Sequence, residues 1–506
     1  MEDGWEFSPA VPQSRRQGCS SLRVVTAEGA GAISYSLAID QGTHASRAIL
    51  FDERGQMVAE ATEEIDLITS DGGIEQNPEQ ILASVKKVVG DVLAGLSAEV
   101  RGKVSCCGLA CQRSTVVPWQ SDGTALANAL SWQDVRAADQ VALLRSKEVD
   151  VRRISGLPLS PHYGASKLRW LLQNSAAVRG CTRERLRLSP LVSYLLFHLL
   201  EEKPYIVDDA NAQRSQLFDV ATRDWSEELT TAFEVPLSYL PRCVPVSATH
   251  GVLEGSHIPM TAVSGDQNAA FFGAGDMAPN TALVNIGSGA FILRPLEGRS
   301  ASDKQLTGIA HSDGNATSYL REATVNGAGN ALNWAQVEWD IPALFVQLPH
   351  WLDQIDDPPV FINSIGGLAA PWWREDVVSH FLDGGEKAKD ADRVVAVVES
   401  IVFSIGANLE LMQAELPLQQ LRVSGGLSQL DGLCQKIADL GGLPVARSDA
   451  SEATARGIAW LAAGRPRRWN QDTSAVDPFL PQPNPGLDKR FERFKMALEE
   501  IPEEKR

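Results

Sequence analysis

Two segments of this chain share one pattern, and that pattern constrains the fold more than any other feature. Residues 36–55 (SLAIDQGTHASRAILFDERG) and 281–298 (TALVNIGSGAFILRPLEG) both predict an apolar strand, a glycine turn with a hydroxyl residue, a second apolar strand and a charged turn. The turns at Gly42 and Gly287 lie about half the chain length apart, the spacing expected of two related domains. Hairpins with glycine turns are also common in unrelated folds, so the pattern alone leaves coincidence open.

Chain length favours two domains. The chain has 506 residues, whereas a single hydrophobic core stops growing near ~250–300 residues. Hydrophobic residues make up 44% and charged residues 22% of the chain, as in ordinary globular proteins. The net charge of -18 disfavours nucleic acid and anionic membranes as partners. No apolar run reaches ~18 residues, so we expect no membrane-spanning segment.

The cysteines predict no disulfide framework, because there are seven of them and they are sparsely spaced. Cys106, Cys107 and Cys111 lie in an apolar strand, VSCCGLACQ, without further metal ligands nearby. We therefore expect these thiols to pack rather than to bind metal. A reducing, cytoplasmic setting is the corresponding expectation.

The coarse pattern of the chain predicts mixed α/β sheets. Three short strands in succession, at 36–40, 47–52 and 56–60, predict an antiparallel meander. Asn77-Pro78 is typical of a helix start, and strands alternate with helices afterwards. Further strands are predicted at 104–110, 259–264, 281–286, 291–293 and 421–424, and further helices at 392–415 and 451–463.

We expect the chain to divide into four parts. Residues 1–32 predict a disordered N-terminal extension; a transit peptide is disfavoured by the acidic residues there. Residues 33–256 are expected to form an N-terminal domain and residues 257–465 a C-terminal domain. Residues 466–506 begin with a stretch rich in proline and polar residues, which predicts a tail.

Both glycine turns are candidate phosphate sites. Glycine lets a backbone approach a ligand closely and point its N–H groups inward, and a threonine or serine adds a donor. The turns at Gly42-Thr43 and Gly287-Ser288 fit this description, although an ordinary tight turn is the alternative. The chain has neither G-x-x-x-x-G-K-[ST] nor G-x-G-x-x-G, so P-loop and Rossmann folds lose their main support.

Two carboxylates are candidates for phosphoryl-transfer chemistry. Asp40 ends the first strand, where it can orient magnesium through water; a solvated turn residue is the alternative. Asp266 follows an apolar strand at a helix start, where a carboxylate can accept the proton of an attacking hydroxyl. A helix N-cap is the alternative for Asp266. We expect Gly265 to clear space for a substrate.

Read together, these fragments resemble the FGGY carbohydrate kinases, the family that contains glycerol kinase, xylulokinase and gluconokinase. The glycerol kinase branch fits best, because the xylulokinase Gln-Met-His-Gly pattern is missing. The resemblance implies an α/β fold of two related actin/hexokinase-like (ribonuclease H-like) domains with an interdomain cleft, and ATP and Mg2+ as cofactors. The segments that carry it are IDQGTHASRAILFD, CQRSTVVPW, SWQDVR, SGDQNAAFFGAG, NIGSGAFIL, NGAGNALNW, VSGGLSQLDGLCQ and SEATARGIAWLAAG.

The resemblance also implies roles for single residues. Asp266 matches the general base of the family, Gln267 its polyol-binding neighbour and Arg113 the substrate-binding arginine. Trp132 and Phe291 match aromatic walls beside the polyol. The positions that match nucleotide contacts are Gly42, Thr43 and Arg47 at the first phosphate site, Gly287 and Ser288 at the second, and Gly329, Asn333 and Gly426 on the adenosine side.

Four positions depart from the glycerol kinase pattern. Ser114 stands where glutamate is usual and His162 where tyrosine is usual, so two directional contacts to substrate hydroxyls change. The preferred polyol need not be glycerol, and the short Ser114 side chain leaves room for a longer substrate. His44 replaces a second threonine beside the predicted phosphates, where it can donate a hydrogen bond or lie on the surface. Asp431 stands near the predicted adenine, where asparagine is common.

The resemblance predicts ATP-dependent phosphorylation of a primary hydroxyl of a small polyol or sugar, in a cleft whose closure excludes water. Two alternatives stay open. One is a kinase relic that binds nucleotide and partners without catalysis. The other is a kinase for a ketopentose such as ribulose or xylulose. Expected partners are a small-molecule substrate, no nucleic acid and no membrane, and a homodimer is left open.

Overall fold

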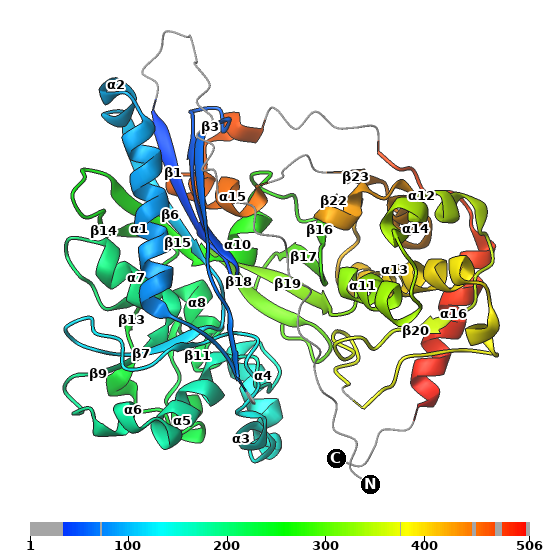
Figure 1. The fold of residues 1–506 in the computed structure, drawn as a ribbon, viewed down its shortest axis with the longest axis horizontal. Coiled ribbons are helices and arrows are strands. Elements are labelled where there is room, and N and C mark those ends of the chain that lie inside the picture. Colours follow the sequence, from blue (N-terminus) through cyan, green and yellow to red (C-terminus); the bar gives the residue numbers. More distant parts are fainter. Residues whose placement is uncertain (1–33, 71–72, 375, 448–451, 471–477, 502–506) are drawn as a thin grey trace.

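The computed structural model describes residues 34–70, 73–374, 376–447, 452–470 and 478–501, and two lobes lie side by side in it (Figure 1). The predicted extension at 1–32 lies outside the described residues, as does Ser451, the expected start of the last helix.

A six-stranded sheet forms the centre of the first lobe, in the order β14-β15-β6-β1-β2-β3. The first three strands form the predicted antiparallel meander, and β6 and β15 run parallel to β1. Helices α1 and α7 cover the outer face, and α15 packs against the opposite face (Figure 1). The bounds are β1 Tyr35–Gln41, β2 Ala45–Phe51, β3 Met57–Glu64, β6 Val104–Cys111, β14 Ser247–Val252, β15 Pro259–Gly265, α1 Pro78–Gly95, α7 Leu191–Leu199 and α15 Ala453–Ala462.

The second lobe repeats this topology. Its sheet has the order β18-β19-β17-β16-β22-β23, with β16, β17 and β19 antiparallel and with β22 and β23 parallel to β16. Both sheets therefore place the turn between their first two strands at equivalent positions, which confirms the predicted duplication. The bounds are β16 Thr281–Ile286, β17 Ala290–Leu296, β18 Leu306–Ser312, β19 Thr317–Val325, β22 Gln420–Ser424 and β23 Val445–Arg447.

The expected domain boundary at 256/257 falls inside the first sheet. It separates β14 from β15, which pair with each other, and β15 also pairs with β6. The strand at 259–264 was expected to open the second domain, yet it is the last parallel strand of the first one. The chain enters the second sheet only at β16, after α10 (Asp266–Phe271).

Helices cover the outer side of the second sheet. The longest, α13 (Asp390–Glu415), is long and apolar enough to cross a membrane by length and composition alone. However, 89% of its most apolar 18-residue stretch is buried inside the fold. It is the central core helix of this lobe, where it packs against α11, α12 and α14. The bounds of these neighbours are α11 Gly329–Glu338, α12 Leu344–Gln354 and α14 Asp431–Gly441.

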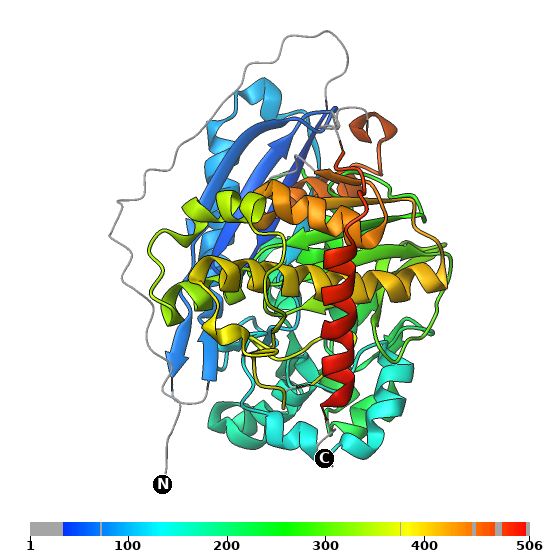
Figure 2. The same cartoon turned by 90° about the vertical axis from the view of Figure 1, so that its right-hand side faces the viewer.

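Residues 466–506 were predicted to form a tail, but their described part includes a helix that packs into the core of the second lobe. Helix α16 (Pro485–Glu500) lies across α13 in Figure 2 and buries Leu487, Phe491 and Phe494 beside Phe403. Asn484 caps the helix, and proline occupies its first position. The apolar residues recur at helical spacing, but the proline-rich stretch before them obscured that signal.

A smaller five-stranded sheet extends the first lobe, in the order β4-β5-β8-β7-β9. Helix α5 (Gly164–Asn174) packs against β7 and β9. Trp132 follows β8, and His162 lies just before α5. This sheet therefore carries two of the predicted substrate-binding residues. The bounds are β4 Ile68–Ser70, β5 Gly73–Gln76, β7 Val116–Gln120, β8 Ala129–Leu130 and β9 Leu186–Pro190.

The β18–β19 hairpin belongs to the second sheet but is hydrogen-bonded to the first lobe. Gln213, at the end of α8 (Asp209–Gln213), donates from Nε2 to the Thr307 carbonyl at 2.7 Å and accepts from the Ile309 N–H at 2.9 Å. Asn268 of α10 donates to the Ile309 carbonyl at 2.7 Å. The two lobes are therefore joined along this hairpin.

The packing of α16 yields a stability prediction. Phe494→Ala removes a fully buried ring that touches Phe403 and Trp372, and we expect it to lower the free energy of unfolding by about 3–5 kcal/mol. Met496→Ala on the exposed side of the same helix is expected to change it by less than about 0.5 kcal/mol. Urea unfolding measures both. Equal, small effects would show that α16 is not part of the core.

Candidate active site

The carboxyl ends of three parallel strands bring the predicted catalytic residues together. Gln41 of β1 aligns with Cys111 of β6, which aligns with Gly265 of β15. Because parallel strands end at the same edge of a sheet, the residues next to these positions meet there. Asp40, Arg113 and Asp266 are those residues, and they come from three separate stretches of sequence.

Asp266 is the first residue of α10, and Gly265 is the N-cap. The Oδ1 atom of Asp266 accepts a hydrogen bond from the Gln267 N–H at 2.7 Å, and Arg113 Nε lies 3.5 Å away. Burial raises the pKa of Asp266, while Arg113 and the Gln267 N–H act in the opposite direction. Asp266 is thus a partly buried carboxylate, 25% exposed, with increased proton affinity and one adjacent cation, and it does not serve as the cap.

Arg113 is fixed by a carboxylate from the other lobe. Glu322 of β19 accepts from Arg113 Nη1 at 3.2 Å and from Nη2 at 3.3 Å, and it also accepts from Arg214. Burial alone would raise the pKa of Glu322, but the two guanidinium groups outweigh it and lower the pKa to about 2. The triad is buried and spans the lobes. Sequence analysis missed both Glu322 and Arg214, because nothing local in YLREATV or ANAQRSQ indicates pairing at such separations.

We had expected Gly265 to clear space for a substrate, but Arg113 fills the space that the missing side chain leaves. A Cβ atom at this position would lie 2.6 Å from Cδ of Arg113 and 2.8 Å from Oδ1 of Asn268. Asn268 itself accepts from Arg113 Nη1 at 3.1 Å. The missing side chain therefore makes room for the arginine to pass over the end of β15 and reach Asp266.

Asp40 is a second carboxylate at the same strand edge. Burial, followed by the charges of Asp266 and Glu452, raises its pKa to about 7, against the opposing effect of Arg47. Arg47 lies directly across the hairpin from Asp40, but its guanidinium binds Glu452 at 2.7 Å. The negative charge of Asp40 and Asp266 is therefore only partly compensated by protein cations.

The predicted aromatic wall Trp132 contacts both the first turn and His162. Its indole N–H donates to Thr43 Oγ1 at 2.8 Å, and its ring centroid lies 5.4 Å from that of His162. Burial, together with Lys167, Arg214 and Arg113, lowers the pKa of His162 to about 3. The imidazole is thus neutral at pH 7 and can both donate and accept a hydrogen bond.

The remaining predicted substrate residues differ in whether their polar atoms already have hydrogen-bond partners in the protein. The Ser114 hydroxyl donates to the Arg214 carbonyl at 3.2 Å, and its backbone φ is 66°, so the donor expected for a substrate is already engaged. Among the described residues no donor reaches the buried Oε1 of Gln267. Phe291 pairs with Thr324 of β19 and so shares a sheet face with Glu322, two residues away.

The second glycine turn is packed against α11 and the end of β22. The Gly329 N–H donates to the Gly287 carbonyl at 2.9 Å, and the Asn330 N–H donates to the Ser288 carbonyl at 2.9 Å. A Cβ atom at Gly425, whose φ is 90°, would lie 2.5 Å from the Ile286 carbonyl oxygen. The structure thereby brings the predicted adenosine-side segments to the second turn.

Four predicted nucleotide residues on these segments and on the first turn, Asp431 among them, are exposed. Asn333 lies on the exposed side of α11, and Gly426 borders open space. His44 is exposed on the first turn. Asp431, at the start of α14, binds Arg447 at 2.5 Å. This ion pair ties the Asp431 carboxylate to β23.

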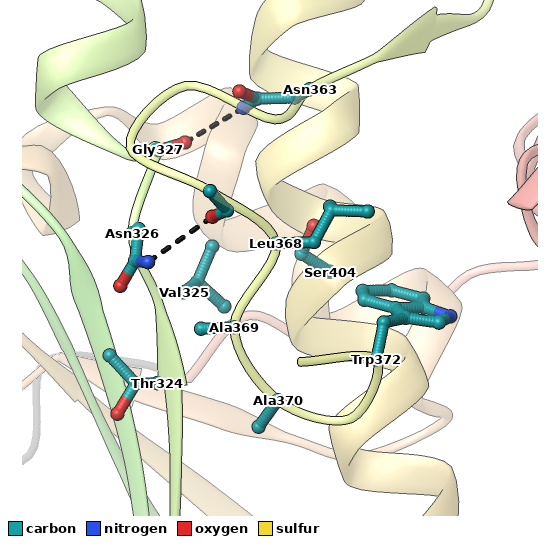
Figure 3. Close-up of a pocket in the computed structure, with 11 residues that line it drawn as sticks. Thr324, Val325, Asn326, Gly327, Asn363, Leu368, Ala369, Ala370, Trp372 and Ser404 are labelled. Atoms are coloured by element: carbon teal, nitrogen blue, oxygen red, sulfur yellow. Dashed lines mark hydrogen bonds between the residues drawn. The ribbon is translucent and has the colours of Figure 1, made fainter. Parts of the chain in front are cut away.

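Two hollows lie beside these elements. One is bordered by both lobes, from Phe271 of α10 to Arg422 and Ser424 of β22. The other lies behind the second turn, where Asn326 donates to the carbonyl of Gly367 and Asn363 donates to that of Gly327 (Figure 3). Neither hollow is lined by Asp266.

The interlobe triad yields a second prediction. Glu322→Gln leaves two buried guanidinium groups without their common carboxylate, and we expect a loss of about 3–5 kcal/mol in the free energy of unfolding. Glu410→Gln, which breaks an exposed pair with Lys495, is expected to cost at most ~1 kcal/mol. Urea unfolding of both variants measures the difference. A Glu322→Gln protein as stable as the control would contradict the role given to the triad.

Comparisons with known proteins agree with this architecture. Residues 35–273 and 282–464 match the N-terminal and C-terminal domains of the FGGY family of carbohydrate kinases. The chain is 34% identical to a glycerol kinase of Acinetobacter baylyi, over 85% of this chain and 90% of the relative. It is 32% identical to a glycerol kinase of Koribacter versatilis, over 91% and 94%.

Solved structures show the same fold. A Plasmodium falciparum glycerol kinase with ADP superposes with a TM-score of 0.82 at 22% identity, over 92% of this chain and 98% of that one. A xylulose kinase from Rhodospirillum rubrum superposes with a TM-score of 0.83 at 18% identity, with the same coverage. By its two matching domains and its curated relatives, this chain belongs to the FGGY family of carbohydrate kinases and is a phosphotransferase.

Proposed function

We propose that this protein transfers the γ-phosphoryl group of ATP to a primary hydroxyl of a small polyol or sugar, as a glycerol kinase-like enzyme. The observation that carries the proposal is the position of Asp266, a partly exposed carboxylate beside Arg113 at the strand edge next to the first glycine turn. Phosphoryl transfer to an alcohol needs such a base beside a site that holds phosphates.

In this proposal Asp266 accepts the proton of the hydroxyl as its oxygen attacks phosphorus. Burial raises the proton affinity of the carboxylate, which favours proton acceptance, and Arg113 at 3.5 Å acts in the opposite direction by favouring the ionised form. Gln267, with its unsatisfied Oε1, accepts from a second substrate hydroxyl. Trp132, His162 and Phe291 border the carbon chain, and neutral His162 supplies a further hydrogen bond.

The two glycine turns fit a triphosphate because each offers backbone N–H groups without a side chain in the way. We assign the β- and γ-phosphates to Gly42, Thr43 and Ser288, with Arg47 as the nearby cation. Arg47 is half-exposed and bound to Glu452, so it can exchange partners. The remaining proposed nucleotide contacts are His44, Gly287, Gly329, Asn333, Gly426 and Asp431.

Asp40 is the proposed residue for Mg2+. Its carboxylate fits a divalent cation, because burial and the nearby charge of Asp266 disfavour the ionised form and a bound cation would stabilise it. In the described part of the chain no three His, Cys, Asp or Glu side chains group as a metal site, which suits an ion held mainly by water and phosphate. Bound Mg2+ would neutralise charge on the phosphate oxygens.

The altered pocket positions favour a second candidate substrate, a ketopentose or longer polyol. Ser114 has a short side chain, and its hydroxyl already donates to the Arg214 carbonyl. It is therefore a weaker hydrogen-bond acceptor for a glycerol hydroxyl than a carboxylate would be. A kinase relic is disfavoured because Asp266, Arg113 and Gln267 are all present and adjacent. The described cysteines are all free, in keeping with the cytoplasmic setting that we propose.

Asp266→Asn tests the function. We expect kcat to fall by about 10²–10⁴-fold with unchanged thermal stability, because the amide has the same shape but accepts no proton. ADP release with Mg2+ is measured on glycerol, erythritol, ribulose, xylulose and dihydroxyacetone. The control Asp276→Asn, whose carboxylate binds Arg465 at the surface, should keep wild-type rates. Equal background rates on every compound for the wild type would favour the relic.

Asp40 yields a pH prediction. Its pKa is about 7 in the fold, against an ordinary value of 3.8, so the folded state holds this proton more tightly than the unfolded chain does. Its contribution to stability is therefore complete below pH ~4 and is lost as the pH rises toward 7. In EDTA, the free energy of unfolding should fall more steeply between pH 4.5 and 7.5 for the wild type than for Asp40→Asn.

Magnesium gives the same variant a second readout. MgCl2 at pH 7.5 should stabilise the wild type against urea more than it stabilises Asp40→Asn, because the ion favours the ionised carboxylate. Identical pH slopes and identical magnesium effects in the two proteins would refute the assignment of Asp40.

A further inference from the structure

A buried lysine lies behind the proposed substrate pocket, and the chemistry described above does not use it. Lys167 is in the first turn of α5, and its side chain is fully buried. Its Nζ donates to the backbone carbonyl of Trp132 at 3.4 Å and to the backbone carbonyl of His162. One ammonium group thus joins two loops that lie far apart in the sequence.

Each of the two loops carries a residue that we place at the polyol. The rings of Trp132 and His162 meet at 5.4 Å. The Trp132 loop is also bound to the rest of the lobe, because the Trp132 N–H donates to Thr115 Oγ1 at 3.1 Å and its indole N–H donates to Thr43. Lys167 is therefore connected through Trp132 to the first phosphate turn.

A charged lysine is energetically unfavourable at this buried position. Burial lowers the pKa of Lys167 to about 7, and the carboxylate that opposes this effect is Asp134. The charge of Asp134 is largely committed elsewhere, since it accepts from Arg136 Nε at 2.8 Å and from the Ile74 N–H at 2.8 Å. The charges of Arg214 and Arg113 act on His162 in the same direction as that of Lys167, since all three lower its pKa.

An apolar side chain of similar length would fill this site without the cost of removing an ammonium group from water. Lys167 has buried Leu168 and Leu171 as neighbours on α5, and both belong to a continuous hydrophobic cluster. Buried charged groups are weak contributors to stability, and the best-attested reason to keep them is that they fix one arrangement of their neighbours. The two carbonyls that Lys167 holds are those of the pocket walls.

We propose that Lys167 is a positioning residue that fixes the two walls of the polyol pocket, Trp132 and His162, relative to each other and to Thr43 in the first phosphate turn. The inference rests on the proposed function, because it needs the polyol to lie between these walls. Lys167 itself touches neither substrate nor nucleotide. Its loss therefore changes how well the polyol is held more than it changes the chemical step.

Steady-state kinetics of Lys167→Met test the inference. Met is only one atom shorter than Lys and removes the ammonium group with both of its hydrogen bonds. We expect the KM for the best polyol to rise about tenfold or more, with kcat and the KM for ATP each within about threefold of wild type. Lys167→Gln keeps one N–H2 donor without the charge and should give an intermediate polyol KM. If Lys167→Met does not fold, Lys167→Gln decides the question by the same comparison.

A control on the same helix separates positioning from general damage. Arg169→Gln breaks the pair between Arg169 and exposed Glu234 and should leave both KM values unchanged. A folded Lys167 variant with wild-type polyol KM, or one whose kcat falls while the polyol KM stays constant, would overturn the inference. A wild type that phosphorylates none of the compounds would instead overturn the proposed function, and the inference with it.

A double-mutant cycle tests the connection through Trp132. If Lys167 acts on the polyol partly by holding Trp132, the rise in polyol KM caused by Lys167→Met should be at least about threefold smaller in a Trp132→Ala background. Full additivity of the two substitutions would show that Lys167 does not act through Trp132 and would overturn that part of the inference.

Discussion

The buried triad of Arg113, Glu322 and Arg214 is the interaction on which the rest of the site depends. Removing three charges from water costs several kcal/mol per ion, and only close hydrogen-bonded geometry offsets that cost. Glu322 meets the condition with both oxygens. It comes from the second sheet, whereas both arginines come from the first lobe. The side chain that sets the charge beside Asp266 is therefore held in place only when the two lobes are assembled.

The two glycine hairpins occupy equivalent places in duplicated sheets, but they are not equivalent in charge. Asp40 stands two residues before Gly42, and Asn285 stands two residues before Gly287. The first lobe thus contributes a carboxylate with a raised pKa, whereas the second contributes a neutral amide at the matching position. The two sheets therefore offer the same hairpin backbone twice but with different side chains, and the negative charge is concentrated on the side of Asp266, the proposed base.

Sequence patterns predicted what is local. The meander, the Asn77 cap, the strand before Asp266 and the second hairpin all follow from periodicity and turn chemistry within a few residues, and the structure has them. Glu322 and Gly265 show the limit, because their partners are set by how distant elements pack. The domain boundary was misplaced for the same reason: a buried parallel strand such as β15 does not reveal which sheet it joins. Helix α16 was missed although its apolar spacing was visible.

The β18–β19 hairpin has a mechanical consequence. It is a part of the second sheet whose backbone is bound to side chains of the first lobe, through Gln213 and Asn268. Any rotation of one lobe against the other must pivot near this seam, where displacements are smallest. Glu322 of β19 lies on this seam, whereas Gly287 and Gly426 follow β16 and β22, outside the hairpin. Closure of the proposed cleft about this seam would therefore leave the pair between Arg113 and Glu322 in place while the second glycine turn moves relative to the first.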